Sequence, residues 1–300
     1  DNLIGFLVSP EWSAPYTSAF SLGWGHAFNP NLALDTNVIY RHGLHQMRED
    51  QYLGGNSGRE APWPAITDPN TGVASYVGQL GLLTTDGQTK YYSLQTSLNG
   101  RYPKFDFGAS LNLSEARGTQ DNAGTAQITT DYGPFDLWDG GNIATTGGSI
   151  RNEWGRISGS QAIYTFLHGT YRFPHAFQTS AEVGYGTTVA VHPTAFVDVN
   201  GDGYILGDEY VGKRGSGHGG DFFNINLRLG QTFDTGKGTH LEAFLDIFNL
   251  TNHDNYGALV LRQQFEYVGA QISPFPDYLK PVGTTLTPPR TFQLGLRVSF

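Results

Sequence analysis

The segment Thr291-Phe-Gln-Leu-Gly-Leu-Arg-Val-Ser-Phe300 carries an apolar residue at every second position. Side chains of a β-strand point alternately to its two faces, so this pattern predicts a strand with one apolar and one polar face. A register slip of one residue would exchange the two faces, and the pattern therefore also predicts the register. The apolar side consists of Phe292, Leu294, Leu296, Val298 and Phe300, and the polar side carries Gln293, Arg297 and Ser299.

The same alternation recurs along most of the chain. From Tyr16 to Phe28 the even positions carry mostly large side chains, and the odd positions carry only small ones. We count about nine such strands of roughly ten residues each, a length that crosses a bilayer when the strand is tilted. Further alternating segments lie at 34–40, 92–102, 106–113, 162–173, 177–189, 225–229 and 241–247.

The connections between these segments alternate between short and long. The short ones are Asn29–Asn31, Pro103–Lys104, Pro174–Ala176 and Asp234–Thr239. The long ones are Arg41–Thr89, Glu115–Gln161, His192–Asp221 and Thr251–Arg290, all rich in Gly, Asp, Asn and Pro. Long loops without structure are uncommon in compact soluble domains. Short turns at one end and long loops at the other are typical of a bacterial outer-membrane barrel.

The polar faces of the predicted strands carry charged residues as well as Ser and Asn. A dry sandwich core would not tolerate these charges together, whereas a wet or plugged lumen would. We therefore predict that six residues face a lumen: Asp35, Arg101, Glu182, Arg228, Asp246 and Arg297. The alternative is a soluble antiparallel β protein with one solvated face. It must accept four long loops on one edge, and aromatic residues at strand ends where a membrane girdle would place them.

Composition narrows the function classes. The chain of 300 residues has no cysteine, which excludes a disulfide framework and a cysteine nucleophile. The formal net charge of −9 argues against a nucleic-acid partner. No apolar run of about 18 residues predicts a transmembrane helix. No Ser/His/Asp arrangement with a nucleophile elbow is present, so we expect no enzyme and no catalytic residue.

Several segments resemble the Oar-like kind of TonB-dependent receptors. The last ten residues look like the C-terminal signature by which the barrel-assembly machinery recognises outer-membrane barrels. Phe223–Leu229 followed by His240–His253, with the stretch Phe248-Asn249-Leu250-Thr251-Asn252, is similar to the penultimate hairpin of these receptors. Further matches are Tyr92–Leu98 with Arg101, and Asn152–Arg156. The resemblance spans most of Pro15 to Phe300.

The resemblance implies a barrel of about 22 strands with an N-terminal plug. We therefore expect residues 1–300 to be the C-terminal part of an all-β, antiparallel transmembrane barrel, with the plug not in this chain. An open sheet of about nine strands would leave two unpaired edges in lipid, which is untenable. The missing strands and the plug would be upstream or in another chain.

The expected function is ligand uptake across the bacterial outer membrane, energised through the plug. The implied partners are outer-membrane lipid, the barrel-assembly machinery, a TonB-type energy transducer and possible further chains that complete the barrel. One alternative is a structural or adhesive surface barrel. Another is a soluble calcium-binding β-sandwich enzyme. The sequence does not indicate which ligand is transported.

One loop has the composition of a calcium site. The stretch from Asp198 to Glu209 matches the twelve-residue calcium-loop template, with a glycine at the sharp turn. The oxygen ligands would come from Asp198, Asn200, Asp202, the Tyr204 carbonyl and Glu209. No helix pattern flanks the loop, so an EF-hand domain is not predicted. The alternative is a Gly/Asp-rich turn that holds no metal, and we keep Ca²⁺ as an open expectation.

Overall fold

The computed structural model describes residues 2–53, 66–67, 69–72, 74–119, 154–157, 159–191, 194–195, 215–236, 238–256, 264–268, 271–274, 276–278, 280 and 285–300. Within these ranges, no helix is long and apolar enough to cross a membrane.

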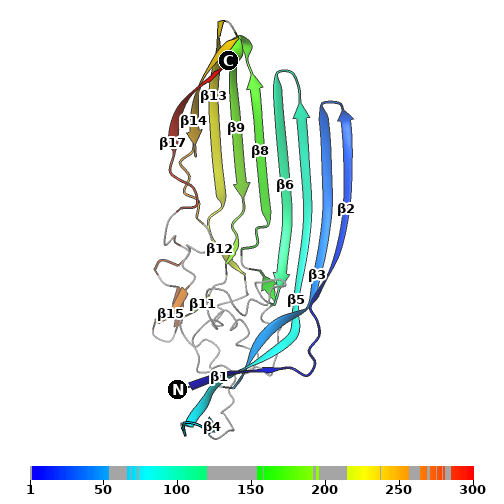
Figure 1. The fold of residues 1–300 in the computed structure, drawn as a ribbon, viewed down its shortest axis with the longest axis vertical. Helices are drawn as coiled ribbons and strands as arrows, with labels where there is room; N and C mark the ends of the chain where they lie inside the picture. Colours follow the sequence, from blue (N-terminus) through cyan, green and yellow to red (C-terminus); the bar gives the residue numbers. More distant parts are fainter. Residues whose placement is uncertain are drawn as a thin grey trace.

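Nine strands lie side by side in one sheet (Figure 1). Their order is β17-β14-β13-β9-β8-β6-β5-β3-β2, and every pair along it is antiparallel. Each neighbour in space is thus also a neighbour among these nine in the sequence, as in a meander. The strands are β2 (Tyr16–Asn29), β3 (Leu32–Leu53), β5 (Ala74–Arg101), β6 (Phe105–Gly118), β8 (Ile163–Arg172), β9 (Phe177–Gly186), β13 (Phe222–Gly236), β14 (Thr239–Phe248) and β17 (Thr291–Ser299).

The four predicted short connections are confirmed. β2 ends at Asn29 and β3 begins at Leu32, and the hairpins β5–β6 and β13–β14 turn as tightly. The 3₁₀ turn Pro174–Ala176 joins β8 to β9, with His175 in the left-handed region at φ 63°. All four turns lie at the same end of the sheet, at the top of Figure 1.

The long connection predicted at Arg41–Thr89 is wrong in large part. β3 continues to Leu53 and β5 begins at Ala74, and the two strands stay paired beyond the ends of their neighbours. Three register shifts interrupt this part of the ladder. Bulges of this kind break the period of two, which is why the sequence pattern did not reveal the strands.

Shorter strands occupy parts of the other connections. β1 (Asn2–Val8) pairs in parallel with residues 76–83 of β5. β4 (Ile66–Thr67) and β7 (Gly155–Arg156) extend the main sheet. Two small sheets lie at the long-loop end. They consist of β10 (Ala190–Val191) with β12 (Gly217–His218), and of β11 (Thr194–Ala195), β15 (Gln264–Val268) and β16 (Gln271–Pro274).

The sheet has one apolar and one polar face along its whole width. On the apolar face, Leu294 of β17 lies opposite Leu245 of β14, which lies opposite Leu229 of β13. On β3 the same face carries Val38, flanked by Leu22 of β2 and Leu94 of β5. The register carries the predicted alternation across all nine strands.

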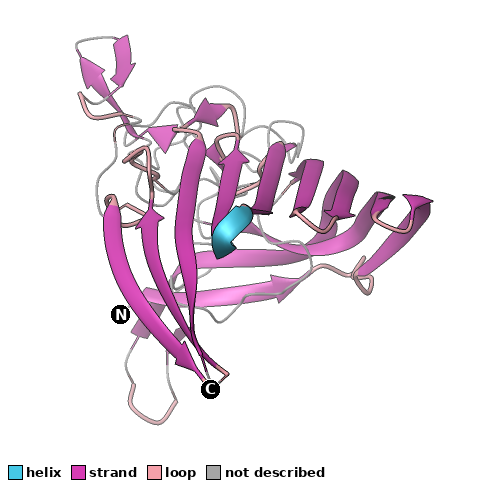
Figure 2. Cartoon of the chain, turned by 90° about the horizontal axis from the view of Figure 1, so that it is seen from above, coloured by secondary structure: helices cyan, strands magenta, loops and turns pink. Residues whose placement is uncertain are grey.

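The apolar face is uncovered in the described part of the chain. Leu294 is 83% exposed, and among the described hydrophobic residues only Ala190 and Ile247 are buried. Seen from above, the sheet curves into an open arc (Figure 2). A soluble sandwich needs a second sheet against its apolar face. The described residues place none there, so the structure does not support the sandwich alternative.

Both edges of the arc, β2 and β17, have no neighbour on their outer side among the described residues. An unpaired strand edge presents a row of free N–H and C=O groups. In hydrocarbon each such group costs several kcal/mol, so these edges require further strands if the apolar face lies in a membrane.

The two faces of β17 predict opposite responses to a buried charge. In the full-length protein refolded into lipid vesicles, Leu296→Arg should lower the free energy of unfolding by about 2–4 kcal/mol, because the guanidinium enters hydrocarbon. Gln293→Arg, on the polar face, should have a mild effect. Urea titration of both variants measures the difference, and equal losses would contradict the orientation.

Candidate functional site: the polar face of the sheet

The six charged residues predicted to face a lumen all lie on the polar face. Arg228 is opposite Asp246, and Arg297 is opposite Glu242 on the adjacent strand. The register places Glu182 next to Asn226 on this same face. Asp35 and Arg101 lie on it too, opposite Ser97 and Asp106 respectively. That this face lines a lumen stays a prediction.

Several charged residues of the polar face are paired with one another. The Arg228 Nε and Nη2 atoms donate to Asp246 Oδ1 and Oδ2 at 2.5 and 2.7 Å, a bidentate arrangement. The Arg228 guanidinium also lies 4.4 Å from the centroid of the Phe244 ring. Arg172 forms an ion pair with Asp106 on the same face. The wall therefore neutralises much of its own charge.

The Phe244 ring lies over Gly295 of the neighbouring edge strand. A side chain at Gly295 of β17 would collide with the Phe244 ring, so a larger residue there would force the ring to move. Glu242, two positions along β14, lies 3.7 Å from Arg297 of β17, measured from Oε2 to Nη1. These contacts hold the polar face of β17 against β14 in addition to the backbone ladder.

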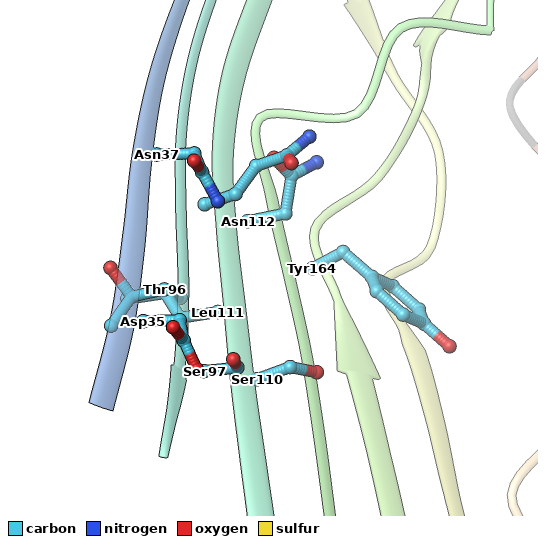
Figure 3. A pocket seen from close by; sticks show the side chains of 9 residues that line it. Asp35, Asn37, Thr96, Ser97, Ser110, Leu111, Asn112 and Tyr164 are labelled. Atoms are coloured by element: carbon cyan, nitrogen blue, oxygen red, sulfur yellow. The ribbon is translucent and has the colours of Figure 1, made fainter. Parts of the chain in front are cut away.

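A polar hollow of about 290 Å³ lies on β3, β5, β6 and β8 (Figure 3). Two cross-strand rows form its wall. In one row Asp35 lies opposite Ser97, which lies opposite Ser110. The other row consists of Asn37, Gln95, Asn112 and Tyr164. Thr96 and Leu111 also border the hollow.

The hollow keeps unused hydrogen-bonding capacity. The Ser93 hydroxyl donates to Asn112 Oδ1 at 2.8 Å. The side chains of Asp35, Asn37 and Gln95 have no hydrogen-bond partner among the described residues. The adjacent strand β2 contributes glycines opposite Asp35 and Asn37, where a Cβ would collide with these side chains. The arrangement can therefore hold water, a polar ligand or a polar protein surface.

Sequence reasoning identified only one residue of this hollow, Asp35. The amides at Asn37, Gln95 and Asn112 were visible as polar positions on separate strands. Their convergence follows from the register between strands, and a single sequence does not give that register.

The stretch Phe248–Asn252 begins a network of asparagines at the long-loop end. Asn249 and Asn252 have φ of 50° and 53°, in the left-handed region that asparagine tolerates better than most residues. Asn249 Nδ2 donates to the carbonyls of His253 and Pro288, both at 3.0 Å. Its Oδ1 accepts from the His253 N–H at 3.0 Å.

Asn255 is the most buried side chain of this network, with 0% exposure. Its Oδ1 accepts from the Phe223 N–H at 2.7 Å, and its Nδ2 donates to the Phe223 carbonyl at 2.9 Å. Nδ2 also donates to Thr287 Oγ1 at 3.0 Å. The network ties the start of β13 to the segment that leads into β17. The resemblance pointed to the stretch but gave no role for it.

The candidate calcium loop lies outside the described residues. This applies to all five predicted ligands, Asp198, Asn200, Asp202, Tyr204 and Glu209. Within the part of the chain that the structure does describe, no group of three or more His, Asp or Glu side chains could hold a metal ion.

No family model matches the sequence, and no curated protein matches it. The structure is similar to that of the outer membrane transporter YddB from Escherichia coli, with a TM-score of 0.51 and 12% sequence identity, covering 97% of this chain and 33% of that chain. The chain therefore has the fold of part of an outer-membrane β-barrel. This confirms the predicted all-β, antiparallel, partial barrel.

A second similar structure is the FrpB iron transporter from Neisseria meningitidis, F3-3 variant. Its TM-score is 0.47 at 12% identity, covering 98% of this chain and 32% of that chain. At this TM-score it adds no weight to the assignment of the fold. The chain spans about a third of the length of both transporters.

The asparagine network predicts a measurable loss of stability. Asn255→Ala leaves the Phe223 N–H and C=O groups without their partner, which should cost about 1–3 kcal/mol in the free energy of unfolding. Asn99→Ala, at an exposed position of β5, is the matched control and should change little. Urea unfolding of the full-length protein measures both. Equal stability of the two variants would contradict a structural role for Asn255.

Proposed function

We propose that this chain is part of the wall of an outer-membrane transporter that takes up a ligand through a barrel of the TonB-dependent type. The observation that carries the proposal is the sheet itself, apolar on one face and polar on the other, in a fold shared with YddB. Such a wall separates lipid from a wet interior. No covalent chemistry is part of this function.

The polar face supports an interior that accommodates other polar groups. Several of its charges are paired with one another, and the hollow around Asp35 and Asn37 offers donors and acceptors that have no partner among the described residues. A plug would satisfy such groups and could release them when it moves. In this proposal the plug and the remaining strands belong to the rest of the protein or to another chain.

The proposed location is the bacterial outer membrane, with the apolar face in contact with lipid. The barrel-assembly machinery would recognise the terminal strand through Phe292, Leu294, Leu296, Val298 and Phe300. A TonB-type energy transducer would act on the plug. Further strands would pair with the free edges of β2 and β17.

A structural or adhesive barrel is the second candidate function. It is favoured by the long ribbon of β3 and β5, which with β1 extends the sheet beyond its neighbours at the long-loop end. An edge or ribbon outside the membrane could bind another surface. In that case nothing would be transported, and no energy transducer would be needed.

Binding of an energy transducer distinguishes the two functions. The full-length protein, purified in detergent, should retain the purified C-terminal domain of TonB, and a variant lacking the plug should not. In planar bilayers the plug deletion should open a large, steady conductance that the intact protein does not show. An open reading frame without a plug, or intact protein that does not bind TonB, would contradict transport and favour the structural barrel.

We also propose that the Asp198–Glu209 loop binds Ca²⁺. The support is its ligand pattern, in which carboxylates that repel one another would be neutralised by the ion. External sites of this kind bind at roughly 10⁻⁴ to 10⁻³ M. Titration calorimetry of the full-length protein should detect binding in this range. Asp202→Asn with Glu209→Gln should abolish it, whereas Asp208→Asn, at a non-ligand position, should not.

A wild-type protein that takes up no Ca²⁺ at this concentration would leave the loop as a Gly/Asp-rich turn. Binding that survives the double substitution would place the ion elsewhere.

A further inference from the structure

A row of basic side chains crosses the lipid-facing side of the sheet at its long-loop end. His42 of β3 lies opposite Lys90 of β5, and Lys90 lies opposite Arg117 of β6. Arg117 in turn lies opposite Arg156 of β7. Four consecutive strands thus place a histidine and three permanent cations side by side, in a chain whose formal net charge is −9.

The register shows that this row shares a face with the apolar residues. Two positions from Lys90 along β5 is Tyr92, which lies opposite Tyr40 with the two ring centroids 5.0 Å apart. One further step in the same direction is the pair Val38 and Leu94. The cations therefore follow directly on an aromatic row, and the aromatic row follows on the apolar band.

This order matches the boundary between hydrocarbon and headgroups. On β3 the apolar band runs over residues 32–40, about 26 Å along the strand at about 3.3 Å per residue. The apolar band of an outer-membrane barrel is about 25 Å tall and is bordered by aromatic girdles. The row lies beyond the girdle at the end opposite the short turns, which is the external side of such a barrel.

The charges in the row are only partly compensated. Like charges directly opposite each other on adjacent strands destabilise a sheet. Glu115 Oε1 lies 2.6 Å from Arg117 Nε, and Lys90 Nζ lies 5.7 Å from the centroid of the Trp154 ring. Arg156 Nη2 donates to the Ser160 carbonyl at 3.1 Å. Within the part of the chain that the structure describes, one carboxylate thus faces three cations, and the buried His42 Nε2 has no hydrogen-bond partner.

We propose that this row, His42–Lys90–Arg117–Arg156, binds the phosphate group of a lipid in the external leaflet. A phosphate offers several anionic oxygens, which lysine and arginine bind by charge-assisted hydrogen bonds. It would relieve the repulsion between Lys90 and Arg117 while the acyl chains of the lipid cover the adjacent apolar band. The inference rests on the proposed location in the membrane, and it does not depend on transport.

Native mass spectrometry of the full-length protein tests the site. The protein is purified in detergent and incubated with diphosphoryl lipid A or with phosphatidylcholine. Wild-type protein should retain diphosphoryl lipid A in preference to the zwitterionic lipid. Lys90→Gln with Arg117→Gln should reduce this retention at least tenfold, and Lys90→Arg should preserve it.

Arg41→Gln is the matched control. Arg41 lies on β3 next to His42 but on the polar face, opposite Tyr91. The Arg41→Gln substitution removes one positive charge at the same position along the strand axis as the basic row, and it should leave lipid retention unchanged. Retention that falls equally in Arg41→Gln and in the double variant would indicate a general charge effect and overturn the site, as would retention that the double variant keeps.

Three further outcomes are decisive. If millimolar inorganic phosphate displaces lipid A completely, the row binds a free anion and the assignment to a lipid is wrong. If the double variant does not assemble, Arg156→Gln alone is the test. It should reduce the retention of lipid A, and unchanged retention would overturn the site. Protein that retains lipids without preference for the anionic diphosphoryl lipid A over the zwitterionic lipid would overturn this site while leaving the proposed membrane barrel intact.

Discussion

Every backbone N–H and C=O group that enters hydrocarbon must find its partner within the protein, and the rest of this structure depends on that constraint. The antiparallel ladder satisfies it for the seven inner strands of the nine, each of which has a neighbour on both sides. The outer edges of β2 and β17 have no partner strand among the residues that the structure describes. If the apolar face lies in a membrane, a curved sheet with two open edges must be part of a closed wall, and the chain covers about a third of YddB.

The side chains follow from the same geometry. Because the period of a strand is two, a wall between lipid and water must alternate, and nine strands in register give two continuous faces. The two faces handle charge differently. On the polar face, Arg228 and Asp246 neutralise each other within the wall. On the described part of the apolar face, charge appears in the aromatic row, where Glu115 lies opposite Tyr92, and past it, where Lys90 and Arg117 lie opposite each other.

The strands, the short turns and the faces could be predicted from the sequence, because each is a local pattern of two to ten residues. The extension of β3 and β5 could not, since register shifts near Gly43 and Gln46 break the alternation that reveals a strand. The hollow around Asp35 could not be predicted from the sequence either, because it depends on which residues of separate strands lie side by side. β1 pairs in parallel with residues of β5 that lie 74 or 75 positions later in the sequence, which no local pattern encodes. The calcium loop stays a prediction.

The central claim is that one face of this sheet contacts lipid and the other contacts water. The chain has no cysteine, so single cysteines along β8 of the full-length protein can be spin-labelled one at a time in lipid vesicles. The account predicts that collisions with oxygen, which is concentrated in lipid, are highest at Leu167 and Tyr171. Collisions with a water-soluble nickel reagent should be highest at His168 and Thr170, giving a period of two in opposite phase. Equal exposure of both sets to the nickel reagent would show that neither face lies in lipid and would contradict the account.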